Sequence, residues 1–219
     1  MSNTHWWLYE VWGDDFSNDM RNSKYNVVRD AYYDLPTSKY YGKSIIALET
    51  KSKLLEEQSW RWYPWPTKIT TPGEHPEALY ADPALKTLKS TAGATYLDQY
   101  MLRLAETYLL RAEAFLMKGD KEKAANDINE VRNRAHTSEV VASEVTIDYI
   151  LDERARELVY EEFRRITLGR LGKYVERVRK YNTLNGPRVE DYHELFPIPY
   201  SAIEANKDAV LEQNPGYKN

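Results

Sequence analysis

Cysteine is absent from the 219 residues of this chain, which excludes disulfides, thiolate catalysis and cysteine-bound metal. No apolar run approaches the roughly 20 residues that a membrane-spanning helix needs. The first residues also lack the basic and then apolar layout of a signal peptide. Basic residues do not dominate: 30 Lys and Arg stand against 34 Asp and Glu, for a net charge of −4. We therefore expect no nucleic-acid partner, because such binding needs a basic patch that displaces counterions from phosphates.

Motifs for metal or cofactor chemistry are missing as well. The four histidines form no zinc-type pair and lie far apart, at His5, His75, His136 and His193. Gly42, Lys43 and Ser44 resemble the end of a phosphate-binding loop, but Thr37 stands where that loop requires a glycine. No Gly-x-Ser-x-Gly elbow supplies a hydrolase serine. We expect neither a cofactor nor a metal site.

Proline and tryptophan divide the chain into three zones. Residues 1–94 hold all six tryptophans and six of the ten prolines, a distribution that breaks long helices and predicts loops and short strands. Residues 95–181 contain no proline, and residues 182–219 are proline-rich again. The predicted order is an aromatic loop and short-strand segment, a helical scaffold and an extended C-terminal tail.

The middle zone is predicted to be helical because its apolar residues recur at helical spacing. A first helix is expected to end at Gly119, and Asp120 can cap a second helix over residues 121–135. Alanines in this second helix allow close approach, as in a tetratricopeptide-type hairpin. Thr146 with Asp148 predicts the start of a third helix over residues 147–168, since acidic groups favour a helix N-terminus. The expected fold is mainly α, with irregular loop and short-strand segments packed on helical hairpins.

The last zone predicts an extended end. Residues 196–199 read Phe-Pro-Ile-Pro and cannot be helical. Residues 200–206 are expected to form one short helical turn. Residues 213–217, Gln-Asn-Pro-Gly-Tyr, are expected to dock as a tail on the body of the protein.

Paired carboxylates are candidate catalytic groups, because glycoside hydrolases use a pair of them. Asp14, Asp15 and Asp19 cluster beside Trp12, without the alternating pattern of a calcium loop. Glutamates and arginines also interleave along the third predicted helix, where Glu161 and Arg165 have the four-residue spacing of helix ion pairs. This favours a structural ion-pair network over a hydrolase that uses Asp14, Asp15 or Glu161.

Aromatic side chains carry the best functional signal. Tyr and Trp number 18 and 6 against only 4 Phe, and both types combine an apolar face with a polar edge. Flat rings of this kind stack on the C–H faces of sugars, so they predict a non-catalytic glycan platform. The alternative is that these rings fill the junction between the loops and the helices. The candidate ligand-binding residues are Trp60, Arg61, Trp62, Tyr63 and Trp65, with Trp6 and Trp7.

Several blocks, in order along the chain, resemble the SusD/RagB family. They are residues 19–26, 103–114, 126–135, 151–158 with Glu161 and Arg164, 196–199 and 213–217. One departure follows Arg164, where the family usually has an aromatic residue and then Asp-Leu, and this chain has Arg165-Ile166-Thr167-Leu168. The departure bears on local packing rather than on membership.

The resemblance implies a non-enzymatic surface lipoprotein of the Bacteroidetes outer membrane that delivers oligosaccharide or polysaccharide to a SusC-like TonB-dependent transporter. Family members are usually about twice this length, with a signal peptide, a lipidated cysteine and further tetratricopeptide-like helices. The chain is therefore expected to be the C-terminal half of such a protein. A RagB-like branch would bind peptides instead, and a purely structural docking domain would leave the ligand site in the other half.

Overall fold

The computed structural model describes residues 3–30, 32–33, 35–44, 64–68, 75–85, 87–92, 98 and 100–218. The chain forms two compact units. Unit 1 comprises Met1–Asn3 and Trp7–Glu161, and unit 2 comprises Thr4–Trp6 and Glu162–Asn219. The division after Glu161 falls within the proline-free residues 95–181, and the three-part domain order stays a prediction.

Helices make up most of the regular structure in the described residues. The α-helices are α2 (Leu104–Met117), α3 (Lys121–Arg134), α4 (Ile147–Glu157), α5 (Arg164–Arg170), α6 (Tyr174–Tyr181) and α7 (Tyr200–Ala205). A π-helical turn, η1 (Trp6–Glu10), is joined by the 3-10 turns η2 (Gly13–Asp15), η3 (Met20–Asn22), η4 (Glu77–Leu79), η5 (Ala142–Glu144), η6 (Gly186–Arg188) and η7 (Asp191–Glu194). The mainly α fold class is therefore confirmed. Within the described part, no helix has the length and apolar character to cross a bilayer.

Among the residues that the structure describes, strands are short and come in two pairs. β1 (Val27–Val28) pairs antiparallel with β2 (Trp65–Pro66). β3 (Tyr80–Asp82) pairs antiparallel with β4 (Thr87–Leu88). Such two-stranded ladders are marginal by themselves, so their positions depend on what else holds them.

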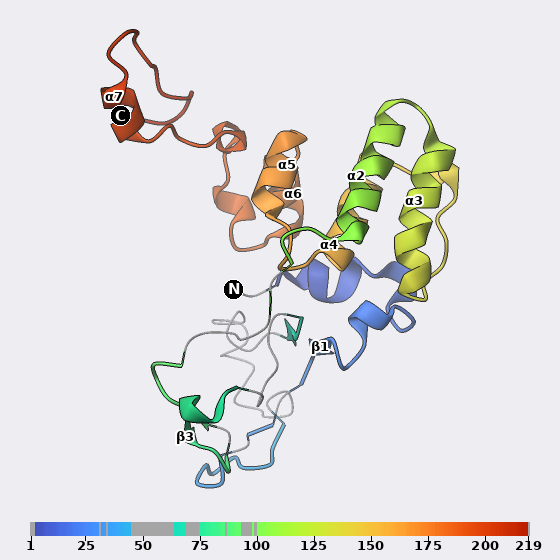
Figure 1. Ribbon diagram of the computed structural model, residues 1–219, viewed down its shortest axis with the longest axis vertical. Helices are drawn as coiled ribbons and strands as arrows, with labels where there is room; N and C mark the ends of the chain where they lie inside the picture. The colour runs from blue at the N-terminus through green and yellow to red at the C-terminus, as the bar shows by residue number, and fades with distance from the viewer. Residues whose placement is uncertain are drawn as a thin grey trace. The chain divides into compact units, whose positions relative to one another are not determined.

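The α2–α3 pair is the predicted tetratricopeptide-like hairpin, with the two helices side by side in Figure 1. Gly119 has a φ of +80° directly after the end of α2, a left-handed conformation that glycine adopts without a steric penalty. Its amide donates to Leu116, and the next amide donates to Phe115, which satisfies carbonyls at the helix end. The Asp120 side chain accepts from the Lys123 amide at 3.1 Å and caps α3, as the sequence predicts.

A contiguous apolar core joins α2, α3 and α4 in unit 1. Ala112 and Ala124 are fully buried and allow the close helix approach that their small size predicts. The other fully buried members of the core are Leu109, Ile128, Val145 and Ile150. Burying one Leu or Ile side chain stabilises a fold by about 1.5–3 kcal/mol, so these contacts hold the hairpin on α4.

The single third helix predicted over residues 147–168 is wrong. Thr146 does cap its start, accepting from the Tyr149 amide at 3.1 Å, but α4 ends at Glu157. Tyr160 then takes a φ of +62°, which no right-handed helix contains, before α5 begins. Side chains from elsewhere favour this ending, because Lys68 and Arg103 donate to the Glu157 carbonyl at the helix end.

The broken helix also overturns the predicted Glu161–Arg165 ion pair. Glu161 lies after the end of α4, in unit 1, and its carboxylate pairs with Lys68 and Arg103. Arg165 belongs to α5 in unit 2, where its guanidinium donates to the carbonyls of His193 and Glu194. Glu161 and Arg165 therefore do not lie on one continuous helix, and their four-residue spacing does not bring them together.

The C-terminal tail of unit 2 is hydrogen-bonded to the Phe-Pro-Ile-Pro segment and to Leu195 just before it, and its predicted docking on the body of the protein stays a prediction. The Gln213 side chain accepts from the Ile198 amide at 2.7 Å and donates to the Ile198 carbonyl at 2.8 Å. Asn214 donates to the Phe196 carbonyl at 2.7 Å, and the Tyr217 hydroxyl donates to the Leu195 carbonyl at 2.9 Å. Residues at the end of the chain are thus hydrogen-bonded to a segment about fifteen positions earlier.

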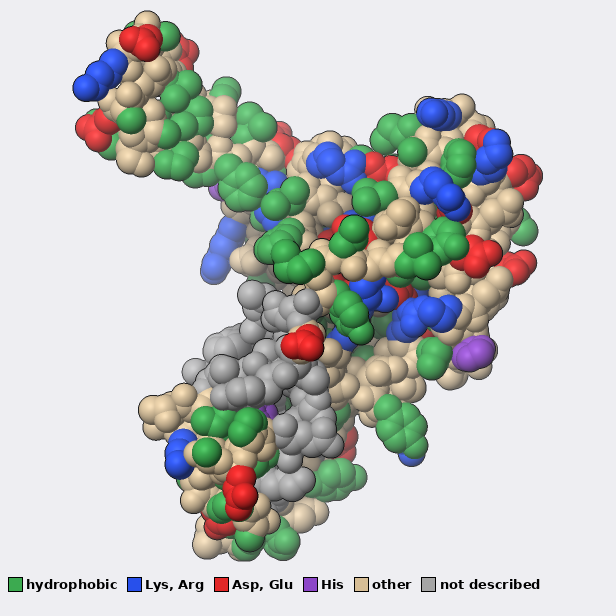
Figure 2. Space-filling model, in the orientation of Figure 1, with side chains coloured by type: hydrophobic (Ala, Val, Ile, Leu, Met, Phe, Trp, Pro, Cys, Tyr) green, Lys and Arg blue, Asp and Glu red, His purple; other side chains and the backbone are tan. Residues whose placement is uncertain are grey.

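Surface charge is mixed, in agreement with the sequence. Figure 2 shows Lys and Arg side chains interspersed with Asp and Glu on the described part of the face in view. No basic stripe of the kind that tracks a phosphate backbone is seen on that face.

Candidate binding site

Trp65 is the one candidate of the Trp60–Trp65 cluster that lies among the described residues. It stands on β2 opposite Val28, while the neighbouring pair, Pro66 and Val27, is buried. Because side chains alternate across a strand, burying Val27 and Pro66 turns Trp65 to the other face. The Trp65 side chain is 40% exposed there, so part of its flat ring is accessible to a ligand.

The strand that carries Trp65 is joined to β1 beyond the ladder itself. The Thr67 amide donates to the Asn26 carbonyl at 2.9 Å, and the Thr67 hydroxyl donates to the Tyr25 carbonyl at 2.8 Å. Tyr25 is 77% exposed, so the segment just before β1 carries a second accessible ring. Trp60, Arg61, Trp62 and Tyr63 lie outside the described residues.

Trp7 and Trp12 form part of the interior of unit 1. Their side chains are 6% and 3% exposed, and their rings meet edge to face at 5.3 Å. The Trp7 indole donates to the Ala155 carbonyl at 2.7 Å, and the Trp12 indole donates to the Trp7 carbonyl at 2.7 Å. Both polar edges are therefore satisfied within the protein, and Trp7 presents little ring to a ligand.

Trp6 belongs to unit 2 and is half-buried. Its ring stacks on Tyr181 at 4.2 Å with an interplanar angle of 29°. The Arg177 guanidinium lies 5.4 Å from the Trp6 ring and 4.8 Å from Tyr181, while Lys180 lies 4.9 Å from Tyr181. These cation–π contacts stabilise the stack on α6.

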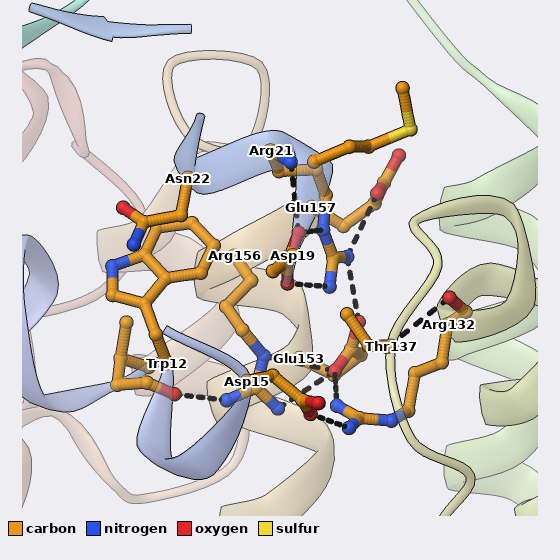
Figure 3. A network of polar contacts seen from close by, with 12 residues as sticks. Trp12, Asp15, Asp19, Arg21, Asn22, Arg132, Thr137, Glu153, Arg156 and Glu157 are labelled. Atoms are coloured by element: carbon orange, nitrogen blue, oxygen red, sulfur yellow. Dashed lines mark hydrogen bonds and ion pairs between the residues drawn. The ribbon is translucent and has the colours of Figure 1, made fainter. Parts of the chain in front are cut away.

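Unit 1 also contains a buried network of carboxylates and guanidinium groups (Figure 3). Glu153, fully buried on α4, pairs with Arg21 at 2.7 Å, Arg132 at 2.9 Å and Arg156 at 2.7 Å. Burial raises the pKa of the Glu153 carboxyl, but Arg156, Arg21 and Arg132 outweigh it and lower that pKa to about 2. The carboxylate is therefore ionised at neutral pH.

Glu157 is a second centre of this network, one turn further along α4. Its carboxylate pairs with Arg21 at 3.0 Å, Arg103 at 2.9 Å and Arg134 at 2.6 Å. Burial raises the pKa of the Glu157 carboxyl, and Arg21, Arg134 and Arg103 together lower it below its ordinary value. The network thus joins α4 to segments far away in the sequence.

Two members of the acidic cluster near Trp12, Asp15 and Asp19, belong to the same network. Asp19 pairs with Arg21 at 2.7 Å, and Asp15 pairs with Arg132 at 2.6 Å. Burial raises the pKa of the Asp15 carboxyl, but hydrogen bonds from Ser138 and the charge of Arg132 lower it overall. Throughout the described ranges, no group of three or more His, Asp or Glu side chains is arranged to hold a metal ion.

Lys68, Arg21 and Arg103 are residues whose roles sequence reasoning missed. Arg21 and Arg103 stand in blocks that resemble the family, and this was the available signal. Their carboxylate partners lie 132 and 54 positions away, at Glu153 and Glu157. No local spacing rule reports contacts over such separations.

These features define a class: a helical-hairpin protein with a buried ionic core and part-exposed aromatic rings on short strands. The chain belongs to the SusD family, whose SusD_RagB model matches residues 9–217. It is 40% identical over 138 residues to the starch-binding protein SusD of Bacteroides thetaiotaomicron, covering 59% of this chain and 24% of that protein. The chain thus spans about a quarter of the length of this relative. A solved structure titled BT4246 aligns with a TM-score of 0.46 and 25% identity, over 60% of this chain and 26% of that one.

Proposed function

We propose that this chain is a non-catalytic, glycan-binding part of a SusC/SusD-type nutrient uptake system in the outer membrane. The observation that carries the proposal is the family match over residues 9–217, together with 40% identity to a starch-binding relative. By the same reasoning, the parent protein is a surface lipoprotein that works with a SusC-like TonB-dependent transporter. Glycan binding is favoured over the RagB-like peptide alternative because the relative is named for binding starch.

Trp65 supports a stacking mode of recognition. A sugar ring carries C–H groups on its faces, and these pack on a flat aromatic ring, while the indole N–H remains free to bond a hydroxyl. The 40% exposure of Trp65 leaves ring surface for such a contact. Trp60, Trp62 and Tyr63 stand close to it in sequence and extend the proposed platform, with Arg61 as a hydroxyl donor.

The surroundings of the candidate catalytic carboxylates support a protein that binds glycan without hydrolysing it. A glycosidase acid must hold its proton near neutral pH, which requires a raised pKa. The pKa of Asp15 is lowered instead, and Glu161 lies between Lys68 and Arg103 at 2.8 and 2.7 Å.

The test is retardation of the protein in native gels that contain starch or amylopectin. Wild type is expected to be retarded, and Trp65→Ala is expected to be retarded clearly less than wild type. Tyr200→Ala, which removes a 57% exposed ring from α7 in unit 2, is the matched control and is expected to keep the retardation. Unretarded wild type, or release of reducing sugar from starch, would overturn the proposal.

A further inference from the structure

Lys68 follows Trp65 by three positions and reaches away from the strand to the end of α4. Its ammonium pairs with the Glu161 carboxylate at 2.8 Å and donates to the Glu157 carbonyl. The Lys68 side chain is 30% exposed, and the Glu161 side chain is 12% exposed. The contact is therefore shielded from water on most of its surface.

Both acceptors of this ammonium are held from other directions. Arg103 donates to Glu161 at 2.7 Å and to the Glu157 carboxylate at 2.9 Å. Arg21 and Arg134 also pair with the Glu157 carboxylate, and the Glu157 side chain is only 1% exposed. Lys68 thus binds to groups that are already immobilised by the buried network.

The Trp65 strand needs such support. Its ladder with β1 is two residues long, which is marginal without further contacts. Thr67 ties the strand to the two residues just before β1, whereas Lys68 ties it to the helical scaffold. A ring that stacks on a ligand loses less freedom on binding when its backbone is fixed beforehand.

We propose that Lys68 is a positioning residue: held by Glu161 and the Glu157 carbonyl, it fixes the strand that presents Trp65 and so increases affinity for glycan. The affinity part rests on the proposed function. The positioning part concerns the protein without ligand and is tested separately.

Electrostatics add a pH signature to the geometry. Burial lowers the pKa of the Lys68 ammonium, and Arg103 lowers it further, while the facing Glu161 and Glu157 carboxylates raise it. The net shift is downward, so Lys68 loses its proton at a lower pH than an ordinary lysine. The attachment is expected to weaken at alkaline pH, and an arginine at this position would remove that response because it stays protonated.

The binding experiment is titration calorimetry with maltoheptaose. Lys68→Met is expected to weaken affinity about fivefold by restoring an ordering cost to the strand, and Lys68→Arg is expected to keep most of it. Lys123→Met, which removes an exposed lysine paired with Asp120 on α3, is the matched control and is expected to bind as wild type does. In the Trp65→Ala background, Lys68→Met is expected to have no additional effect, because Lys68 acts through that ring.

The ligand-free experiment follows the fluorine NMR signal of Trp65 in protein labelled with 5-fluorotryptophan, assigned by its loss in Trp65→Phe. Lys68→Met is expected to shift or broaden this signal, whereas Lys123→Met is expected to leave it unchanged. In wild type the signal is expected to move as the pH is raised toward 10, and in Lys68→Arg it is expected to stay. Thermal unfolding of each variant checks that the fold is retained.

The outcomes separate the two proposals. If wild type does not bind maltoheptaose, the glycan function fails, and the fluorine signal still decides the positioning. If Trp65→Ala weakens binding and Lys68→Met does not, the role of Lys68 in affinity is refuted while the function stands. An unchanged Trp65 signal in Lys68→Met would overturn the positioning itself.

Discussion

Arg156 donates two hydrogen bonds to a single carboxylate oxygen of Glu153, three residues earlier on α4. Oε2 of Glu153 accepts from Nε of Arg156 at 3.0 Å and from Nη2 at 2.7 Å. The remaining guanidinium nitrogen of Arg156 donates to the Val11 carbonyl. Through this pair, the tryptophan-rich start of unit 1 is joined to α4 inside the protein. The contact thus fastens an irregular segment to a helix that lies 145 positions later in the chain.

Replacing Glu153 by Gln is expected to destabilise unit 1 by about 3–5 kcal/mol, the usual cost of leaving a buried charge without its partner. Arg21, Arg132 and Arg156 would all lose a carboxylate contact. Urea unfolding followed by circular dichroism measures the loss. Glu176→Gln, which removes a 55% exposed carboxylate on α6, is the control and is expected to leave the unfolding midpoint in place.

Acid is expected to destabilise the protein between about pH 4.5 and pH 2. The folded pKa of Glu153 is about 2 against an ordinary value of 4.5, so its stabilising contribution is complete above pH 4.5 and is lost as the pH falls toward 2. A shift of this size corresponds to a contribution on the order of 3 kcal/mol. Glu157 and Asp15, whose pKa values are also lowered, add in the same direction. Thermal unfolding over this pH range should show a shallower decline in Glu153→Gln than in wild type.

Two tryptophans are expected to differ in what their removal changes. Trp7→Ala should cost about 3–5 kcal/mol, because it empties a buried site and leaves the Ala155 carbonyl without its donor. Trp65→Ala should cost about 1 kcal/mol or less, because its ring is part-exposed. Chemical unfolding of both variants checks the contrast. Equal losses would contradict the assignment of Trp7 to the core and Trp65 to the surface.

Gly216→Ala is expected to release the C-terminal tail. A Cβ at this position would lie 2.3 Å from Cγ of Tyr192, in a backbone with φ of +87° that disfavours any other residue. Amide hydrogen exchange at Ile198, whose N–H is bonded by Gln213, should then become faster. Gly172→Ala is the control, because Gly172 also has a positive φ, +61°, but no heavy atom lies within 4 Å of the added Cβ. It introduces backbone strain without a side-chain clash. Equal exchange at Ile198 in both variants would refute the clash.

Local structure proved readable wherever one residue type determines it. Gly119, Asp120 and Thr146 each have the conformation or cap that their chemistry predicts. The non-helical Phe196-Pro197-Ile198-Pro199 segment was also predicted, because its two prolines cannot stand inside a helix. These predictions needed no knowledge of distant residues.

Features set by distant residues were not predictable. The end of α4 depends on donors from Lys68 and Arg103, which lie 89 and 54 positions from Glu157. The apolar spacing predicts that this helix continues through Tyr160, because periodicity carries no information about side chains from distant parts of the chain. The same holds for the candidate site, where Trp6, Trp7 and Trp65 lie in different surroundings although their ring chemistry is the same. Ligand contact by these residues stays a prediction.

The hydrogen bonds of the Gln213 side chain bear on protection against aggregation. Pro197 and Pro199 have no backbone N–H, so Ile198 supplies the only donor across these three positions of extended chain. Gln213 bonds both the amide and the carbonyl of Ile198, as a neighbouring strand would. An exposed extended edge invites pairing with other chains and then aggregation. The Gln213 amide group thus occupies the backbone donor and acceptor of Ile198 that a pairing strand would otherwise use.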